Sequence, residues 1–340
     1  MLNTLSRRVF LGSLGLTAGG LWTGSSTLIH AGNKGRRRFK KSELVRKLSG
    51  VHNFLTTPFR SDYELDADGL RRNVAAHARA PLKDMTIVVS GGLGELFTLS
   101  VEEHKELVKA ALAGAQGKLP VVAGVGGGYK NAIQMAQNAE AAGADAVLVF
   151  AYPFACDNAD GAFQYLQAVA KSVRIGVLAY PCGKSGFSAD VLKSLAELPN
   201  VVGFKDASGG VKVATDLGPL IGDEFLWIAE GEGHAEKALP AGSRAYTSAV
   251  ATFVPQACRE FWRQGVAGNT DRMKEVNKTR IVPIVKLRGV KPGYGISGIK
   301  VALESLGRAG GPVRPPYTQV QEEDRPKIAA IARKHAEKLR

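Results

Sequence analysis

Short apolar runs alternate with amphipathic stretches eight times between residues 50 and 269, and this alternation constrains the fold more than any other feature. The runs are rich in β-branched residues and hydrophobic at consecutive positions, a pattern typical of parallel strands covered on both faces. The predicted strands are Val51–Thr57, Met85–Ser90, Pro120–Gly124, Ala146–Ala151, Ile175–Tyr180, Val201–Phe204, Phe225–Ala229 and Ala245–Val250. The predicted helices lie near 66–79, 101–116, 130–142, 159–172, 188–198, 211–221, 233–240 and 255–267.

Eight regular strand–helix units predict a closed (β/α)₈ barrel, the TIM barrel, over residues 50–269. A doubly wound open sheet is the alternative, but it rarely needs so many regular repeats. Residues 270–340 are predicted to be a helical region appended to the barrel, interrupted at Gly289–Gly298 and Gly307–Pro316.

The positive charge is concentrated before the predicted barrel. The net charge of the chain is +14, and its first 50 residues hold ten Lys or Arg against one acid, Glu43. The remainder is only mildly basic, and a charge run outside a fold is usually a solvated tail. We therefore expect no nucleic-acid partner.

The N-terminus resembles an export signal. Ser6–Leu11 (S-R-R-V-F-L) matches the twin-arginine pattern, and a Gly/Ala/Leu-rich apolar stretch continues to about Leu21. We expect residues 1–31 to be a twin-arginine signal segment read by the Tat translocase, and 32–49 to be a disordered basic linker. The protein would then be periplasmic or otherwise extracytoplasmic. The alternative is an amphipathic N-terminal helix of a cytoplasmic protein.

The cysteines do not indicate a disulfide framework or a metal site. Cys156, Cys182 and Cys258 lie far apart, with no C-x-x-C pair and no cluster of Cys and His. We expect buried or inert thiols, and neither a metal nor an organic cofactor.

Lys205 is the strongest candidate for chemistry. It follows the apolar run Val201–Phe204, so it would point into the mouth of the barrel, where burial disfavours a charged ammonium. A neutral amine there can attack a ketone and form an imine that serves as an electron sink. The alternative is a structural lysine, ion-paired to Asp206 or to an acid on a neighbouring strand. Tyr180 ends the preceding strand and could relay protons to the same space, or be a packed aromatic at the rim.

Other polar groups fall at the carboxyl ends of the predicted strands, where barrel enzymes place their active sites. Thr57 lies at the end of the first strand, and Thr247 and Ser248 lie in the eighth. The turn Gly91–Glu95 follows the second strand, and its consecutive backbone N–H groups can hold a carboxylate. It could equally be a plain strand–helix turn.

Taken in order, these residues resemble the dihydrodipicolinate synthase/N-acetylneuraminate lyase family of class I Schiff-base lyases. The resemblance runs from Val51 to the C-terminus, and its finer match is to the 5-dehydro-4-deoxyglucarate dehydratase branch. G-G-L-G-E-L-F-T-L-S at Gly91–Ser100 is similar to that branch's G-G-T-G-E-F-F-S-L. Asn200–Asp206, Ala245–Pro255 and Gly311–Pro316 also resemble it.

The resemblance implies a role for each matching position. Lys205 matches the Schiff-base lysine, Tyr180 the proton-relay tyrosine, and the Gly92–Leu93 backbone the site of the keto acid's carboxylate. Thr247 and Ser248 match residues of strand eight that line the same pocket. The branch's reaction is loss of water and CO₂ from a 2-keto-3-deoxy sugar diacid to give 2,5-dioxopentanoate. The family also implies a homo-oligomer, either a dimer or a tetramer.

The sequence departs from the family at three places. Leu93 replaces a threonine, and Gly92 stands where many members carry a second hydroxyl. After Tyr180 the chain runs Pro-Cys-Gly-Lys, so the residue expected at the distal end of the substrate is missing unless Lys184 replaces it. Tyr152–Pro153 stands where Pro-Tyr is often found.

We therefore expect a lyase that dehydrates and decarboxylates 5-dehydro-4-deoxyglucarate. An aldolase or synthase of the same family is the first alternative, because all these reactions pass through one enamine. An exported sugar-acid binding protein with little turnover is the second, favoured by Leu93 and the twin-arginine segment.

Overall fold

The computed structural model describes residues 39–80, 82–151, 159–181 and 187–339. The twin-arginine segment, the first part of the predicted linker and Lys184 lie outside the described residues, as do Cys156 and Cys182. No helix of the described part is long and apolar enough to span a membrane.

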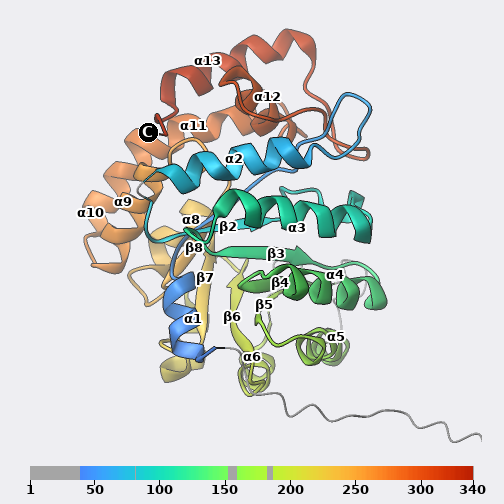
Figure 1. Cartoon of the computed structure of the whole chain (residues 1–340). Helices are drawn as coiled ribbons and strands as arrows, with labels where there is room; N and C mark the ends of the chain where they lie inside the picture. The colour runs from blue at the N-terminus through green and yellow to red at the C-terminus, as the bar shows by residue number, and fades with distance from the viewer. Residues whose placement is uncertain (1–38, 81, 152–158, 182–186, 340) are drawn as a thin grey trace, which may run out of the picture. The chain divides into compact units, whose positions relative to one another are not determined.

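Eight parallel strands close into a barrel in chain order, with β8 paired back onto β1 (Figure 1). Almost every strand residue is buried, because helices cover the outside and side chains fill the inside. The predicted barrel is thus confirmed, and the open-sheet alternative is wrong. The strands are β1 Gly50–Phe54, β2 Met85–Val89, β3 Val121–Val125, β4 Ala146–Phe150, β5 Gly176–Tyr180, β6 Val201–Asp206, β7 Leu226–Glu230 and β8 Ala245–Ser248.

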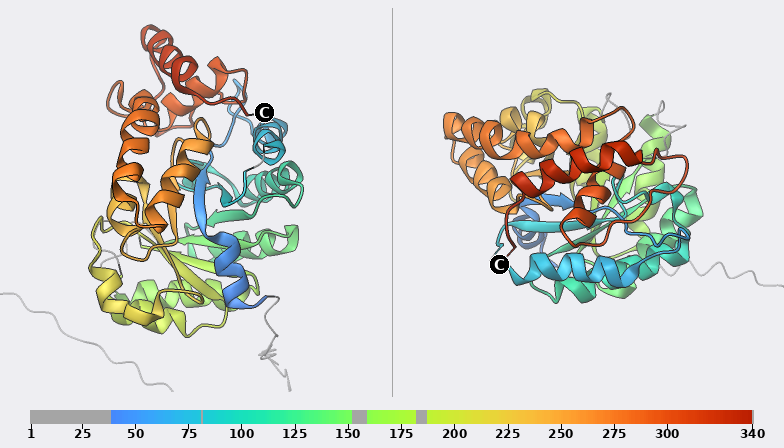
Figure 2. Two further views of the ribbon diagram at one scale, coloured as in Figure 1. Left: turned by 90° about the vertical axis from the view of Figure 1, so that its left-hand side faces the viewer. Right: turned by 90° about the horizontal axis from the view of Figure 1, so that it is seen from above.

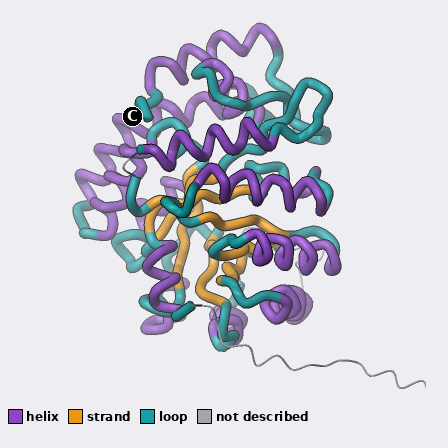
Figure 3. The backbone as a smooth tube through the Cα atoms, in the orientation of Figure 1, coloured by secondary structure: helices purple, strands orange, loops and turns teal. Residues whose placement is uncertain are grey.

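A helix follows each strand, and together these helices surround the sheet (Figure 3). Side-chain caps fix where several begin: Asp66 accepts from the amide of Gly69 at 2.8 Å, and Ser100 and Glu103 form a reciprocal capping box. The helices are α2 Ala67–Arg79, α3 Val101–Ala115, α4 Tyr129–Ala142, α5 Ala159–Ser172, α6 Ala189–Ala196, α7 Lys212–Leu217, α8 Gly231–Ala238 and α9 Pro255–Val266, with short 3₁₀ turns η1 Leu96–Thr98 and η2 Gly218–Leu220.

Part of the predicted linker is helical. The prediction of a disordered segment over 32–49 is wrong for α1 Lys41–Leu48, whose Leu44, Val45 and Leu48 are buried. The Lys47 ammonium pairs with Asp145 at 2.5 Å, next to the start of β4. The helix therefore covers the amino ends of the strands. Its basic composition concealed an amphipathic pattern, in which Arg46 and Lys47 reach solvent while the apolar residues pack inward.

The predicted C-terminal helical region is helical and packs firmly on the barrel. Its helices bury apolar side chains such as Ile284, Ile299 and Ile328. Figure 2 shows α12 and α13 gathered at one end of the barrel. The elements are α10 Thr270–Val276, the π-helical turn η3 Asn277–Ile281, α11 Val282–Val285, the 3₁₀ turn η4 Lys286–Gly289, α12 Ser297–Ser305, the 3₁₀ turn η5 Glu322–Asp324 and α13 Arg325–His335.

This region contacts the loops that follow β1 and β2. The amide of Phe59 donates to the carbonyl of Gly310 at 3.3 Å, and the guanidinium of Arg314 binds Glu103. Lys300 on α12 forms a fully buried ion pair with Glu95 at 2.5 Å. The C-terminal region is thus part of the wall at the carboxyl end of the barrel, where active sites of this fold lie.

Candidate functional site

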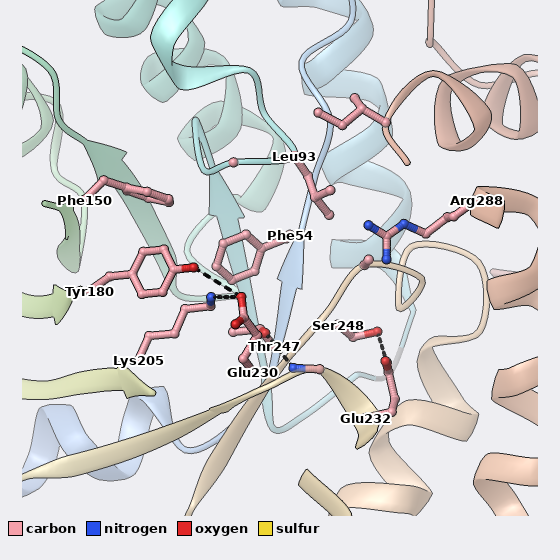
Figure 4. A pocket seen from close by; sticks show the side chains of 14 residues that line it. Phe54, Leu93, Phe150, Tyr180, Lys205, Glu230, Glu232, Thr247, Ser248 and Arg288 are labelled. Atoms are coloured by element: carbon pink, nitrogen blue, oxygen red, sulfur yellow. Dashed lines mark hydrogen bonds and ion pairs between the residues drawn. The ribbon is translucent and has the colours of Figure 1, made fainter. Parts of the chain in front are cut away.

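A cavity of about 340 Å³ opens among the carboxyl ends of the strands (Figure 4). This volume lies near the lower end of the roughly 300–1,000 Å³ range of small-molecule sites. Its lining comes from most of the strand ends, from the turn after β2 and from the C-terminal region. The cavity therefore suits a small molecule that several strands can reach at once.

Lys205 lies at the bottom of this cavity, near the end of β6. Its side chain is 5% exposed, and its Nζ forms an ion pair with Glu230 Oε1. Asp206, the other partner considered from the sequence, faces away and accepts from the indole of Trp227 at 3.1 Å. Lys205 is thus an ion-paired lysine, but one paired inside a cavity rather than within the packed core.

Tyr180 ends β5 and lies beside Lys205, as expected from neighbouring strands. Its hydroxyl donates to the same Glu230 Oε1 at 3.2 Å, and its ring centroid lies 3.7 Å from the Lys205 ammonium. The ring packs edge-on against Phe150 at a centroid distance of 5.0 Å. One carboxylate oxygen therefore connects the ammonium and the phenol.

Glu230 is the central residue that the sequence analysis missed. It is the last residue of β7, one position beyond the predicted strand, and its side chain is 43% exposed. Applying the strand-end rule to this strand would have found it. Because it contacts both Lys205 and Tyr180 and also reaches solvent, Glu230 can exchange protons with either.

The turn after β2 presents unused backbone donors to the cavity. Gly92 and Leu93 line it, and neither amide donates a hydrogen bond within the described part of the chain. Thr57 does not line the cavity; its hydroxyl donates to the carbonyl of Gly94 at 2.6 Å and so supports the turn from behind. Glu95, held by Lys300, fixes the other end of the turn with a left-handed φ of 56°.

Thr247 and Ser248 of β8 line the cavity as predicted, and both are bonded to the segment after β7. Thr247 Oγ1 accepts from the amide of Gly231 at 3.1 Å, and Ser248 Oγ donates to Glu232 Oε1 at 2.6 Å. Burial raises the pKa of Glu232, which the bond from Ser248 partly offsets. These contacts place a hydroxyl and a carboxyl group along one wall.

Arg288 and Ile296, from the C-terminal region, complete the lining. Arg288 could not be selected from the sequence, because it lies some 80 residues beyond Lys205 in a region predicted to be peripheral. Lys184, the predicted distal partner, lies outside the described residues. Among the described residues no group of three or more His, Cys, Asp or Glu side chains could hold a metal ion.

The comparison with protein families assigns almost all of the described chain. Residues 47–335 match the model of the dihydrodipicolinate synthetase family. A probable 5-dehydro-4-deoxyglucarate dehydratase of Ralstonia nicotianae is 32% identical over 308 residues, which are 88% of this chain and 97% of the relative. A protein of the same name from Rhizobium meliloti is 34% identical over 281 residues, 82% of this chain and 92% of the relative.

The solved structures agree in fold. The crystal structure of dihydrodipicolinate synthase from Bacillus clausii superposes with a TM-score of 0.76 at 28% identity and covers 86% of this chain and 99% of its own. Barrel topology, the order of the motifs and a match over most of the sequence all lead to one assignment. The chain belongs to the dihydrodipicolinate synthetase family.

Proposed function

We propose that the protein is a Schiff-base lyase that converts 5-dehydro-4-deoxyglucarate into 2,5-dioxopentanoate, water and CO₂. The observation that carries the proposal is Lys205, buried at the base of the cavity with its ammonium in contact with Glu230 and Tyr180. The relatives named above as probable dehydratases of this compound support the choice of substrate.

The first step needs the neutral amine of Lys205. Glu230 is in contact with the ammonium and can take its proton, leaving the amine lone pair free to attack the C2 ketone. Tyr180, bonded to the same carboxylate, can then protonate the carbinolamine oxygen, which leaves as water as the iminium forms. The two side chains thus supply a base and an acid on one side of the cavity.

The iminium withdraws electrons and so allows the C3–H, C4–O and C5–C6 bonds of the substrate to break in turn. Loss of a proton from C3 gives an enamine, whose electrons expel the C4 hydroxyl as water and leave a C3=C4 double bond conjugated with the iminium. The C5–C6 bond then breaks, CO₂ leaves, and its electron pair passes through C4 and C3 to the nitrogen. Protonation at C4 and C3 and hydrolysis release 2,5-dioxopentanoate and Lys205. No external oxidant or reductant is needed.

The substrate's C1 carboxylate must lie beside the imine carbon. The amides of Gly92 and Leu93 face the cavity without an acceptor in the described part of the chain, so they are suited to hold it. The loss of a threonine hydroxyl at Leu93 leaves these backbone donors in place.

Product analysis tests the proposal. Wild-type protein incubated with 5-dehydro-4-deoxyglucarate is expected to release one CO₂ and one 2,5-dioxopentanoate for each substrate molecule. NMR measures both products. Lys205→Ala should abolish turnover, whereas Lys109→Ala, at an exposed position on α3, should not change it. Formation of pyruvate and a three-carbon aldehyde acid would show aldol cleavage instead, and binding without any product would favour the binding-protein alternative.

We also propose that the protein is exported by the twin-arginine route, on the basis of Ser6–Leu11 and the apolar stretch behind it. Residues 1–31, fused to a fluorescent protein that must fold before it is exported, should carry that protein across the inner membrane. Its fluorescence should then be found outside the cytoplasm. Replacing Arg7 and Arg8 with lysine should retain it in the cytoplasm. Export that is unaffected by this double change would exclude the route.

For assembly, we propose a homodimer or homotetramer, as the family resemblance implies. Light scattering behind size exclusion should give two or four times the chain mass of 36.0 kDa. A single-chain mass at micromolar concentration would contradict this.

A further inference from the structure

Arg288 reaches the cavity from outside the barrel. It lies in η4, where its neighbour Leu287 is fully buried and anchors the turn. Its Nε donates to the carbonyl of Gly295 at 3.0 Å, which fixes the plane of the guanidinium. Figure 4 shows the guanidinium turned into the cavity on the side opposite Lys205, beyond Ser248. The side chain is thus held in place rather than extended into solvent.

Most of the guanidinium's donors are unused. Within the described part of the chain, the bond from Nε is the only hydrogen bond that Arg288 makes. Burial lowers the pKa of Arg288 and the charge of Glu232 opposes that shift, but no ion pair joins the two within the described part of the chain, and Glu232 Oε1 already accepts from Ser248. Burial also raises the pKa of Glu232, which weakens its competition for the cation. A half-buried guanidinium with free Nη donors is a site for an anion, and a carboxylate matches its fork.

The order of groups along the cavity matches the order of groups in a sugar diacid. Lys205 fixes the ketone carbon next to one carboxylate, so the second carboxylate must lie at the far end of the chain. Ser248, bonded to Glu232, lies on the wall between Lys205 and Arg288 in Figure 4 and can bond to hydroxyls in the middle of the molecule.

We infer that Arg288 binds the distal carboxylate of the substrate and makes the site selective for 2-keto sugar diacids over monoacids of the same length. The inference rests on the proposed Schiff-base function and adds the residue that chooses the substrate class. It also explains why the C-terminal region packs against the barrel mouth, since that contact delivers Arg288 to the site.

The test compares one diacid with one monoacid. Apparent dissociation constants of 5-dehydro-4-deoxyglucarate and 2-keto-3-deoxygluconate are measured by their protection of the protein against borohydride trapping with pyruvate. Arg288→Met should weaken binding of the diacid between about 10- and 100-fold, because a charge-assisted pair is lost. It should change the dissociation constant of the monoacid less than twofold. Arg288→Lys should recover part of the diacid affinity, because it restores the charge without the fork.

Lys286→Met is the matched control, since it removes the same charge from an exposed position in the same turn. It should leave both constants unchanged, and melting curves confirm that each variant is folded. Equal weakening of diacid, monoacid and pyruvate in Arg288→Met would place the guanidinium at the C1 carboxylate and overturn the inference. Unchanged diacid affinity would also overturn it while leaving the imine chemistry intact. If the wild type forms no imine with pyruvate, the proposed function itself fails and the inference with it.

Discussion

Replacing Lys300 with methionine is expected to destabilise the protein and loosen the turn that we propose binds the substrate's carboxylate. Lys300 Nζ lies 2.5 Å from Glu95 Oε1, and both side chains are 0% exposed. Nζ also donates to the carbonyl of Pro312 at 2.6 Å. Removing the ammonium leaves the Glu95 carboxylate buried, with the amide of Arg314 at 2.8 Å as its remaining hydrogen-bond donor.

The expected magnitude follows from that burial. Removing one partner of a buried ion pair costs about 3–5 kcal/mol, because the other charge stays desolvated and uncompensated. With an unfolding entropy of about 2.1 cal/mol/K per residue, the melting temperature of a domain of this length falls by roughly 1.6 °C for each kcal/mol of lost stability. The melting temperature should therefore fall by about 5–8 °C. Adding Glu95→Gln should recover part of this loss, because the double variant buries no unpaired charge.

Alkaline pH tests the burial of Lys300 separately, because the neutral amine can still donate to Glu95 and to the carbonyl of Pro312, whereas methionine cannot. Burial lowers the pKa of Lys300 from 10.5 to about 8, against the opposing effect of Glu95. Between these values the unfolded chain holds a proton that the folded chain lacks, so this group makes stability rise with pH across the window. The rise should be absent in Lys300→Met.

Urea unfolding and calorimetry measure both effects, with Lys109→Met, an exposed lysine on α3, as the control. The reasoning is refuted if Lys300→Met melts within 1 °C of that control, or if the double variant is less stable than the single one.

Three further changes test separate parts of the structure. Burial lowers the pKa of His52 and His104 to about 4; stability should be full above pH 6.5 and fall toward pH 4, by about 2 kcal/mol per histidine at pH 5. In His104→Gln that acid loss should shrink, and an unchanged pH profile would contradict the assignment. Glu230→Gln should slow imine formation with pyruvate about 100-fold in rapid-quench trapping; a wild-type rate would remove Glu230 from proton transfer. In Gly91→Ala the new Cβ would meet the Phe54 ring at 2.8 Å, so we expect about 1–3 kcal/mol of destabilisation by urea unfolding and weaker pyruvate binding; unchanged values would show that the ring can move aside.

Much of the fold could be predicted because parallel barrel strands leave a strong mark on the sequence. Most of them contain runs of consecutive hydrophobic residues, since both faces of the strand are covered, and the capping residues Asp66, Ser100 and Ser188 mark where helices begin. The helix α1 was not predicted, because its apolar face is narrow and lies among basic residues. Propensity and charge cannot reveal that the amino end of a barrel needs covering.

The site was predicted where it depends on strand order and missed where it depends on distant packing. Lys205 and Tyr180 meet because β5 and β6 are adjacent and pair Ala179 with Phe204, which places the next residue of each strand side by side. Glu230 was one residue beyond a predicted strand end, so the information was local. Arg288 was not predictable in this way, because it reaches the cavity only through the packing of the C-terminal helices on the loops after β1 and β2.

The central claim is that Lys205 forms an imine with a 2-keto acid, and borohydride trapping tests it most directly. Wild-type protein is incubated with pyruvate, reduced with borohydride, digested and mapped by mass spectrometry. The account predicts a single reduced adduct on the peptide that carries Lys205, and none in Lys205→Ala. An adduct on a different lysine, or no adduct with pyruvate or with 5-dehydro-4-deoxyglucarate, would contradict it.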